Sequence, residues 1–110
     1  MTEPWIIAEC ETTMLITYCQ NNDTENALSK IKGGIANVNA TCGKGNTIFL
    51  YCSRFNNTIL MNALLDTDKV YDDAFKIGDK GLSAIENLKY FNNAEIYNRI
   101  LLICKDKYNM

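Results

Sequence analysis

Residues 45–65, GNTIFLYCSRFNNTILMNALL, set the pattern for the whole chain. Thr47 opens a short apolar run that continues through Cys52, and a polar break follows at residues 54–57. A second apolar run then ends in the pair Leu64 and Leu65. The stretch therefore contains two short apolar segments with a polar break between them.

The same order of features occurs once upstream and once downstream. Upstream, Thr13 opens a run that is broken at residues 21–23, and the second run reaches Ile31. Downstream, Ser83 opens a copy that is broken at residues 91–93 and closes at Ile100 and Leu101. The opening residues of successive copies are 34 and 36 residues apart. The chain thus contains three copies of one unit, over residues 12 to 103.

This unit resembles the ankyrin repeat, whose period is about 33 residues and whose pattern is G-x-T-P-L-H-x-A-A, a turn and a second helix ending in Leu-Leu. Thr47 stands at the family's threonine, Phe49 at its leucine, and residues 64–65 at the closing leucine pair. Residues 34–40, GIANVNA, are similar to the family's G-A-D-V-N-A with one extra residue. The chain departs from the family by lacking its proline and histidine; those positions hold Met14, Ile48 and Ala84, and Ile16, Leu50 and Glu86. Each lost histidine hydrogen bond is worth about 0.5–1.5 kcal/mol, so we expect lower stability than in a consensus array.

The resemblance implies an all-α fold, an ankyrin-repeat solenoid of stacked helix-turn-helix pairs with projecting β-turn fingers. We expect a single domain over residues 1–110, with a cap segment (1–11), repeat 1 (12–44), repeat 2 (45–80) and repeat 3 with a C-terminal cap (81–110). The predicted helices cover residues 12–20, 24–32, 47–55, 57–66, 83–91 and 93–106. Trp5, Ile6 and Ile7 are expected to fold over the first repeat, because a terminal repeat leaves one apolar side open. Val70, Tyr71 and Phe75 are expected to anchor a longer connection at residues 67–82.

Composition and charge exclude several classes of protein. The net charge is −2 with scattered basic residues, whereas nucleic-acid binding draws on clustered Lys and Arg. No apolar run approaches the roughly 20 residues of a membrane span, and the N-terminus lacks the pattern of a secretory signal. These features predict a cytoplasmic protein, of a cell or of the host that it enters, with neither nucleic acid nor membrane as partner.

The residues for catalysis, metals or cofactors are also missing from the sequence. There is no histidine, the usual general base near neutral pH, and the glycines form no nucleotide-binding motif. The five cysteines form no C-x-x-C pair, which argues against zinc. The aspartates at 66, 68, 72, 73 and 79 lack the order of a calcium loop and read as a solvated segment. We expect no enzyme and no cofactor, with Cys19 and Cys52 buried and Cys42, in a turn, as the cysteine most open to oxidation.

Partners of ankyrin arrays dock on a concave face lined by the fingers and the first helices. Carried over to this chain, the family's positions predict a protein-binding site at Gln20, Asn21, Lys44, Asn46, Arg54, Phe55, Lys80, Leu82, Tyr90 and Phe91. Among these, Lys44, Asn46, Lys80 and Leu82 are finger positions, and the first finger is expected at residues 35–46. Aromatic side chains and arginine are enriched at protein interfaces. The alternative is that the rings pack between neighbouring repeats.

The leading functional hypothesis is a non-catalytic protein-protein interaction module that acts as an inhibitor, adaptor or effector. The richness of the chain in Asn, Ile, Lys and Tyr suggests an AT-rich genome, such as that of a virus, an intracellular bacterium or a protist. The alternative is a structural or self-associating repeat unit that forms homo-oligomers. Its candidate surface is the last helix, with Ile96, Tyr97, Ile100 and Leu101.

Overall fold

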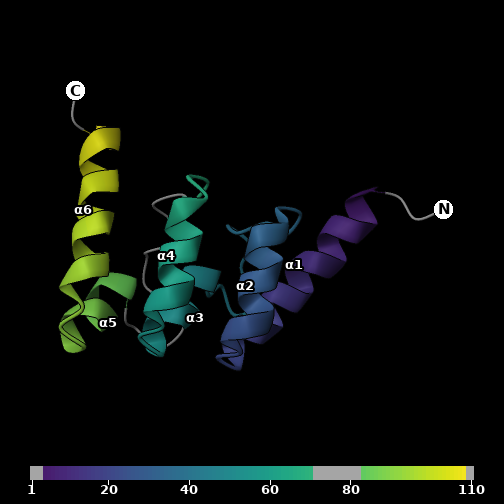
Figure 1. Cartoon of the computed structure of the whole chain (residues 1–110), viewed down its shortest axis with the longest axis horizontal. Coiled ribbons are helices and arrows are strands. Elements are labelled where there is room, and N and C mark those ends of the chain that lie inside the picture. The colour runs from purple at the N-terminus through teal and green to yellow at the C-terminus, as the bar shows by residue number, and fades with distance from the viewer. Residues whose placement is uncertain (1–3, 71–82, 109–110) are drawn as a thin grey trace.

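The computed structural model describes residues 4–70 and 83–108, and all regular secondary structure in them is helical (Figure 1). This confirms the predicted all-α class. The helices are α1 (Pro4–Gln20), α2 (Thr24–Gly33), α3 (Ile48–Arg54), α4 (Thr58–Asp66), α5 (Ala84–Tyr90) and α6 (Ala94–Tyr108). The predicted ranges lie within a few residues of these bounds, except at the start of α1. Residues Tyr71, Phe75, Lys80 and Leu82, for which the sequence predicted roles, lie outside the described residues.

Consecutive helices form three antiparallel pairs, and the same tight turn joins the helices within each pair. The second residue of each turn is an asparagine with positive φ, between 50° and 55°, at positions 22, 56 and 92. Asparagine tolerates this left-handed conformation better than most residues. The next backbone N–H donates to a carbonyl five residues back, at 2.8 Å from Asp23 and at 2.9 Å from both Asn57 and Asn93. The polar breaks in the sequence are therefore three copies of one turn.

The residue after each turn asparagine caps the following helix. Side-chain oxygens of Asp23, Asn57 and Asn93 accept hydrogen bonds from backbone N–H groups three residues ahead. Such caps satisfy donors that have no partner within the helix. Thr47 and Ser83 cap the short helices α3 and α5 in the same way. The opening threonine and serine of the sequence pattern are thus the start signals of these helices.

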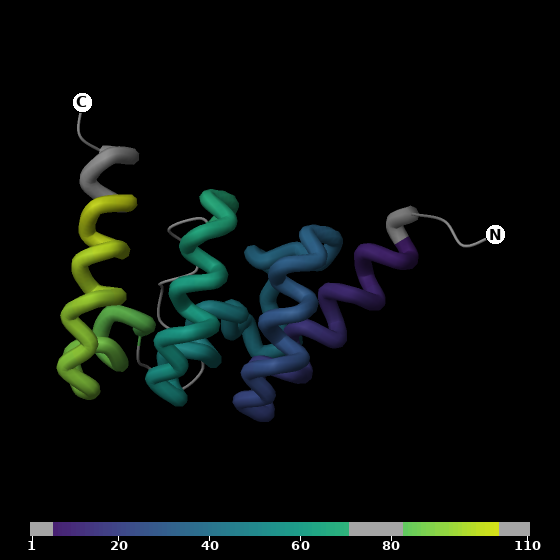
Figure 2. Tube along the Cα trace, viewed as in Figure 1, coloured from purple at the N-terminus to yellow at the C-terminus, as the bar shows by residue number. Residues whose placement is uncertain are grey.

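The helix pairs lie side by side along the longest axis of the molecule, with α2 next to α4 and α4 next to α6 (Figure 2). We call the boundary between α1–α2 and α3–α4 the first junction, and that between α3–α4 and α5–α6 the second junction. At each junction the side-chain amide of the capping asparagine donates to an asparagine and a threonine of the preceding pair. These bonds, of 2.8 to 3.0 Å, join Asn57 to Asn22 and Thr24, and Asn93 to Asn56 and Thr58. We call them the asparagine ladder.

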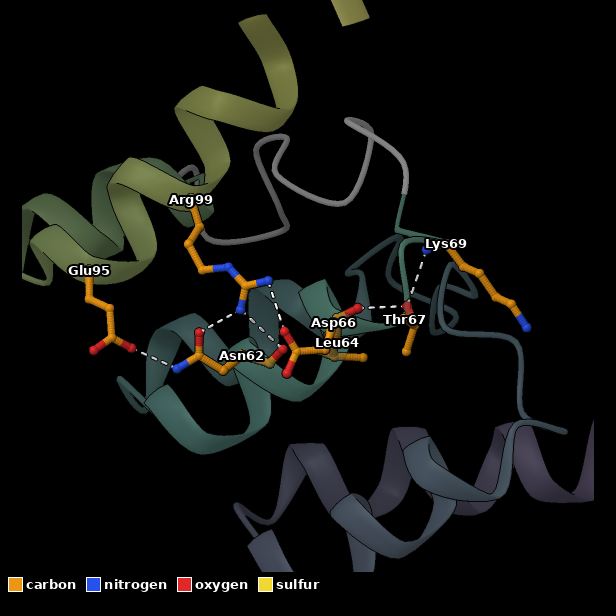
Figure 3. Close-up of polar contacts among 7 residues, drawn as sticks. All are labelled: Asn62, Leu64, Asp66, Thr67, Lys69, Glu95 and Arg99. Atoms are coloured by element: carbon orange, nitrogen blue, oxygen red, sulfur yellow. Dashed lines mark hydrogen bonds and ion pairs between the residues drawn. The ribbon is translucent and has the colours of Figure 1, made fainter. Parts of the chain in front are cut away.

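Beyond the ladder, the second junction carries a network of polar side chains between α4 and α6 (Figure 3). Arg99 donates to the side-chain oxygen of Asn62 at 2.8 Å and forms an ion pair with Asp66 at 2.9 Å. The amide of Asn62 donates in turn to Glu95 at 2.6 Å. These polar contacts between the two helices therefore fix how α6 lies against α4.

The core is continuous through both junctions. Its fully buried members come from all six helices and include Leu15, Ala27, Phe49, Leu60, Leu64, Leu88, Ile96 and Ile100. Val38, in the loop after α2, is buried with them. That loop also contains a turn closed by bonds between residues 42 and 45–46, next to an isolated bridge between Thr41 and Thr47. A β-turn therefore lies where the sequence predicted a finger.

Two local predictions are wrong. The N-terminal segment does not fold back over the first pair, because α1 runs without interruption from Pro4 to Gln20 (Figure 1). Proline is well accommodated at the first position of a helix, where its missing N–H costs nothing. Cys42 is also less open than predicted: it is half-buried and its sulfur lies 2.9 Å from the Tyr51 hydroxyl, whereas Cys10 is exposed on α1.

Candidate protein-binding site

The most exposed aromatic side chain of the described residues lies where α5 ends. Tyr90 is 81% exposed, the highest value among the large hydrophobic residues, and Phe91 is 40% exposed. Their rings meet edge to face with centroids 5.1 Å apart. At the equivalent place after α3, Phe55 is 47% exposed. Rings held at the surface in this way offer apolar area that a partner could bury.

A groove of about 510 Å³ lies beside the Tyr90–Phe91 pair and extends to the end of α3. It is lined by Arg54, Glu86, Asn87, Lys89, Tyr90 and Phe91. Glu86 belongs to the capping box of α5, where its carboxylate accepts from the backbone N–H of Ser83 at 3.2 Å. The Glu86 carboxylate is therefore turned toward the N-terminal end of α5. Beside it, the groove is lined by two cationic side chains, Arg54 and Lys89, and by the two aromatic rings.

A polar cluster centred on the Tyr51 hydroxyl adjoins the groove through Arg54. Amide groups of Gln20 and Asn46 each donate to this hydroxyl at 3.2 Å. The Arg54 guanidinium donates to Asn46 at 3.4 Å and lies over the Tyr51 ring, 5.4 Å from its centroid. Because Gln20 belongs to the first pair and Tyr51 to the second, the cluster holds α1 and α3 in a fixed relation.

The structure brings several of the predicted site residues together. Gln20, Asn46 and Arg54 meet around Tyr51, and Arg54 shares the groove with Tyr90 and Phe91. Asn21 and Lys44 are exposed. Residues Lys80 and Leu82 lie outside the described residues.

One predicted site residue is placed wrongly by the sequence. Asn46 was expected at the surface of a finger, but it is only 1% exposed. Its side chain binds Tyr51 and Arg54 instead, at the start of α3. Its role in this structure is therefore to position Tyr51 and Arg54.

The residue-by-residue comparison with the ankyrin pattern missed Tyr51 and Lys89. Tyr51 falls within an apolar run, where a sequence pattern cannot show that the hydroxyl collects three polar partners. Lys89 lies one residue before Tyr90 and lines the groove. A search for cations next to aromatic residues would have found Lys89, because it directly precedes Tyr90 in the sequence.

The self-association surface expected on the last helix also needs correction. Ile96 and Ile100 are both 0% exposed and belong to the core. Because they are fully buried, they cannot contact another molecule while the fold is intact. Tyr97 is half-buried, and only Leu101 of the four is exposed.

The buried thiols Cys19 and Cys52 face each other across the first junction, with their sulfur atoms 3.8 Å apart. The hydrogen bond from Cys52 to Cys19, together with burial, raises the pKa of the Cys52 thiol well above its usual value. A thiol that stays protonated is a poor nucleophile. This pair therefore behaves as core, as the sequence predicted.

Within residues 4–70 and 83–108, no three His, Cys, Asp or Glu side chains gather as they would around a metal ion. In the same residues, no helix combines the length and hydrophobicity that crossing a membrane requires. Every buried side-chain nitrogen and oxygen of this part of the chain has a hydrogen-bond partner.

Comparison with known proteins adds no relative: neither a protein-family model, nor a curated protein, nor a solved structure matches the chain.

Proposed function

We propose that the chain is a degenerate ankyrin-like array of three repeats that binds another protein. Its binding surface is the concave face implied by that layout, formed by the ends of α3 and α5. The observation that carries the proposal is the groove between Arg54 and the exposed Tyr90–Phe91 pair. The repeated turns and the asparagine ladder support the array, since they give each pair the same contacts to its neighbour.

The chemistry of the groove indicates the kind of segment that would fit. Two aromatic edges suit an apolar or aromatic side chain of the partner. Arg54 and Lys89 suit a carboxylate next to that side chain, and a guanidinium can hold a carboxylate with two bonds. The proposed ligand is therefore a loop or peptide of a protein that presents an apolar residue flanked by an acid.

Substitution of the aromatic pair tests the proposal. Tyr90→Ala with Phe91→Ala should weaken binding of a partner isolated by affinity capture by at least about 2 kcal/mol, a factor near thirty. Ile59→Ala is the matched control, because Ile59 is 60% exposed on α4 and does not line the groove. The partner's affinity should be measured by calorimetry with all three proteins.

The double variant should melt close to the wild type, because exposed side chains contribute little to folding. If its melting midpoint instead falls by much more than the roughly 4–8 °C that corresponds to 1 kcal/mol in a domain of this size, the rings are part of the core. Equal affinity of the double variant and the wild type would remove this groove from the binding site.

A further inference from the structure

The C-terminal end of the row of helices exposes positions that the two earlier pairs cover. Four equivalent positions on the second helix of each pair show this: Thr24, Ala27, Leu28 and Ile31 on α2; Thr58, Met61, Asn62 and Leu65 on α4; Ala94, Tyr97, Asn98 and Leu101 on α6. All eight on α2 and α4 are buried or half-buried, whereas three of the four on α6 are exposed. Leu65 is 2% exposed and its equivalent Leu101 is 45% exposed. We call the four α6 residues the end face.

The end face continues an interface that the molecule already uses twice. Helix α2 contacts α4, and α4 contacts α6. Among these positions of the earlier helix, Thr24 accepts a hydrogen bond from Asn57, and Asn62 accepts one from Arg99. On the outer side of α6, a groove of about 410 Å³ lies open between Leu88, Lys89, Asn92 and Tyr97. Tyr97 and Leu101 keep the apolar character of Met61 and Leu65. Nothing in residues 4–70 and 83–108 buries Leu101 to the extent that Leu65 is buried.

We infer that the end face binds the end face of a second copy of this chain, tail to tail. The N-terminal end of the row is a poor alternative occupant. The positions of α2 that correspond to the apolar Leu60, Ala63 and Leu64 of α4 hold Asn26, Ser29 and Lys30. Lys30 forms an ion pair with Glu11 at 2.8 Å. Head-to-tail stacking would take these polar groups out of water against Tyr97 and Leu101, which is unfavourable.

A fourth helix pair stacked in register is disfavoured by the end of the asparagine ladder. At each junction the capping asparagine amide of the ladder donates to two acceptors, and one of them is a threonine hydroxyl, from Thr24 or Thr58. The third equivalent position is Ala94, which has no hydroxyl. A capping amide placed there would keep one acceptor, the side-chain oxygen of Asn92, and lose the other.

Two-fold pairing avoids this mismatch, because a side-chain amide is both donor and acceptor. Across a two-fold axis, Asn92 of each copy can donate to the other, and the same patch serves both molecules. Lys89 of α5 borders the end face, because it lies over the Tyr97 ring at 5.8 Å. Two-fold pairing brings the Lys89 side chains of the two copies near each other. Their like charges oppose pairing, so added salt should strengthen the dimer rather than weaken it.

Sedimentation equilibrium at protein concentrations from about 1 µM to about 1 mM tests the inference. This range covers the dissociation constants of weak specific interfaces. We expect a monomer–dimer equilibrium that becomes tighter in salt. Leu101→Lys should weaken dimerisation at least about tenfold, since it places a charge in an apolar contact. Leu102→Lys is the matched control: Leu102 is 61% exposed, but it corresponds to Asp66, outside the end face.

A protein that stays monomeric over the whole range contradicts the inference. Species larger than a dimer, or a loss of association on Lys30→Glu, would show head-to-tail stacking instead. An equal effect of both leucine substitutions would place the contact elsewhere on α6. If the Leu101→Lys variant does not fold, the location of the contact can be measured in the wild type from NMR chemical shifts that change with protein concentration. We expect these changes in Asn92 and α6. Changes confined to α1 and α2 would overturn the inference. The Tyr90→Ala, Phe91→Ala variant should dimerise as the wild type does, which separates this surface from the groove.

Discussion

The first and second junctions join equivalent helices with different chemistry. At the first, the thiols of Cys19 and Cys52 meet in the core, and Leu28 and Ala63 are partly buried on the outer side. At the second, Ser53 takes the position of Cys19 and accepts a hydrogen bond from the Asn87 amide at 3.0 Å. The outer positions of Leu28 and Ala63 are taken by Asn62 and Arg99, which bind each other.

This difference shows how one repeat geometry can be held by two kinds of contact. Apolar surfaces contribute in proportion to the area they bury and set few demands on direction. Buried hydrogen bonds add modest net stability but are costly when one partner is lost. The second junction is therefore more specific in its geometry and more sensitive to substitution. We expect the C-terminal pair to separate before the first junction opens.

The largest expected loss of stability comes from substituting alanine at two equivalent core positions, Leu64→Ala and Ile100→Ala. Both side chains are fully buried, and such changes cost about 2–5 kcal/mol. Leu64 lies in the middle pair, so its loss should unfold the whole molecule, whereas Ile100→Ala should release mainly α5 and α6. Circular dichroism melts and hydrogen exchange measure both. A cost below about 1 kcal/mol for Leu64→Ala would place Leu64 outside the core.

A buried polar pair gives the next effect. Ser53→Ala leaves the Asn87 amide without its acceptor at the second junction, which should cost about 1–3 kcal/mol. Adding Asn87→Leu should recover most of this loss, because removing both partners leaves no unsatisfied group. The free energies of unfolding of the wild type, the two single variants and the double variant, measured in denaturant, form a double-mutant cycle. No recovery in the double variant would mean that Ser53 acts through its bond to the Leu50 carbonyl.

The asparagine ladder is common to both junctions and should respond equally at each. Asn57→Asp and Asn93→Asp keep the capping oxygen but remove the amide donor, and we expect each to cost about 1–2 kcal/mol. Asp23→Asn makes the reverse exchange at the equivalent cap of the first pair, which takes no part in the ladder. It removes the acceptor of the Asn26 amide at 2.8 Å, so it measures the cost of the exchange within one pair. Thermal melts compare the three. A clear loss in Asn57→Asp with none in Asn93→Asp would show that the second junction does not depend on the ladder.

Much of the fold follows from local signals in the sequence. The breaks at residues 21–23, 54–57 and 91–93 specify turn and cap chemistry, so helix positions could be predicted within a few residues. The extent of α1 could not, because the N-terminal residues have no break or cap that would separate them from the helix.

The candidate site was less predictable, since it depends on side chains that meet across junctions. Arg54, Tyr90 and Phe91 were found because their positions relative to the turn are exposed in a regular repeat. The burial of Asn46 was not predicted, because it depends on Tyr51 and Arg54 together. The partners of Arg99 are likewise set by how α6 lies on α4, which no local pattern reports.

The smallest effect is expected from the ion pair of the second junction. The side chains of Arg99 and Asp66 are 35% and 68% exposed, and exposed pairs are typically worth about 0–1 kcal/mol. Asp66→Asn should therefore lower stability slightly at low salt, and the difference should disappear at about 1 M salt, where the screening length is about 3 Å. Hydrogen exchange in α6 at both salt concentrations measures this directly. Arg99→Met is the informative companion, because it also removes the bond to Asn62 and should cost more at every salt concentration. If Asp66→Asn instead costs as much as Ser53→Ala, then the outer side of the second junction contributes as much to its stability as the buried Ser53–Asn87 bond does.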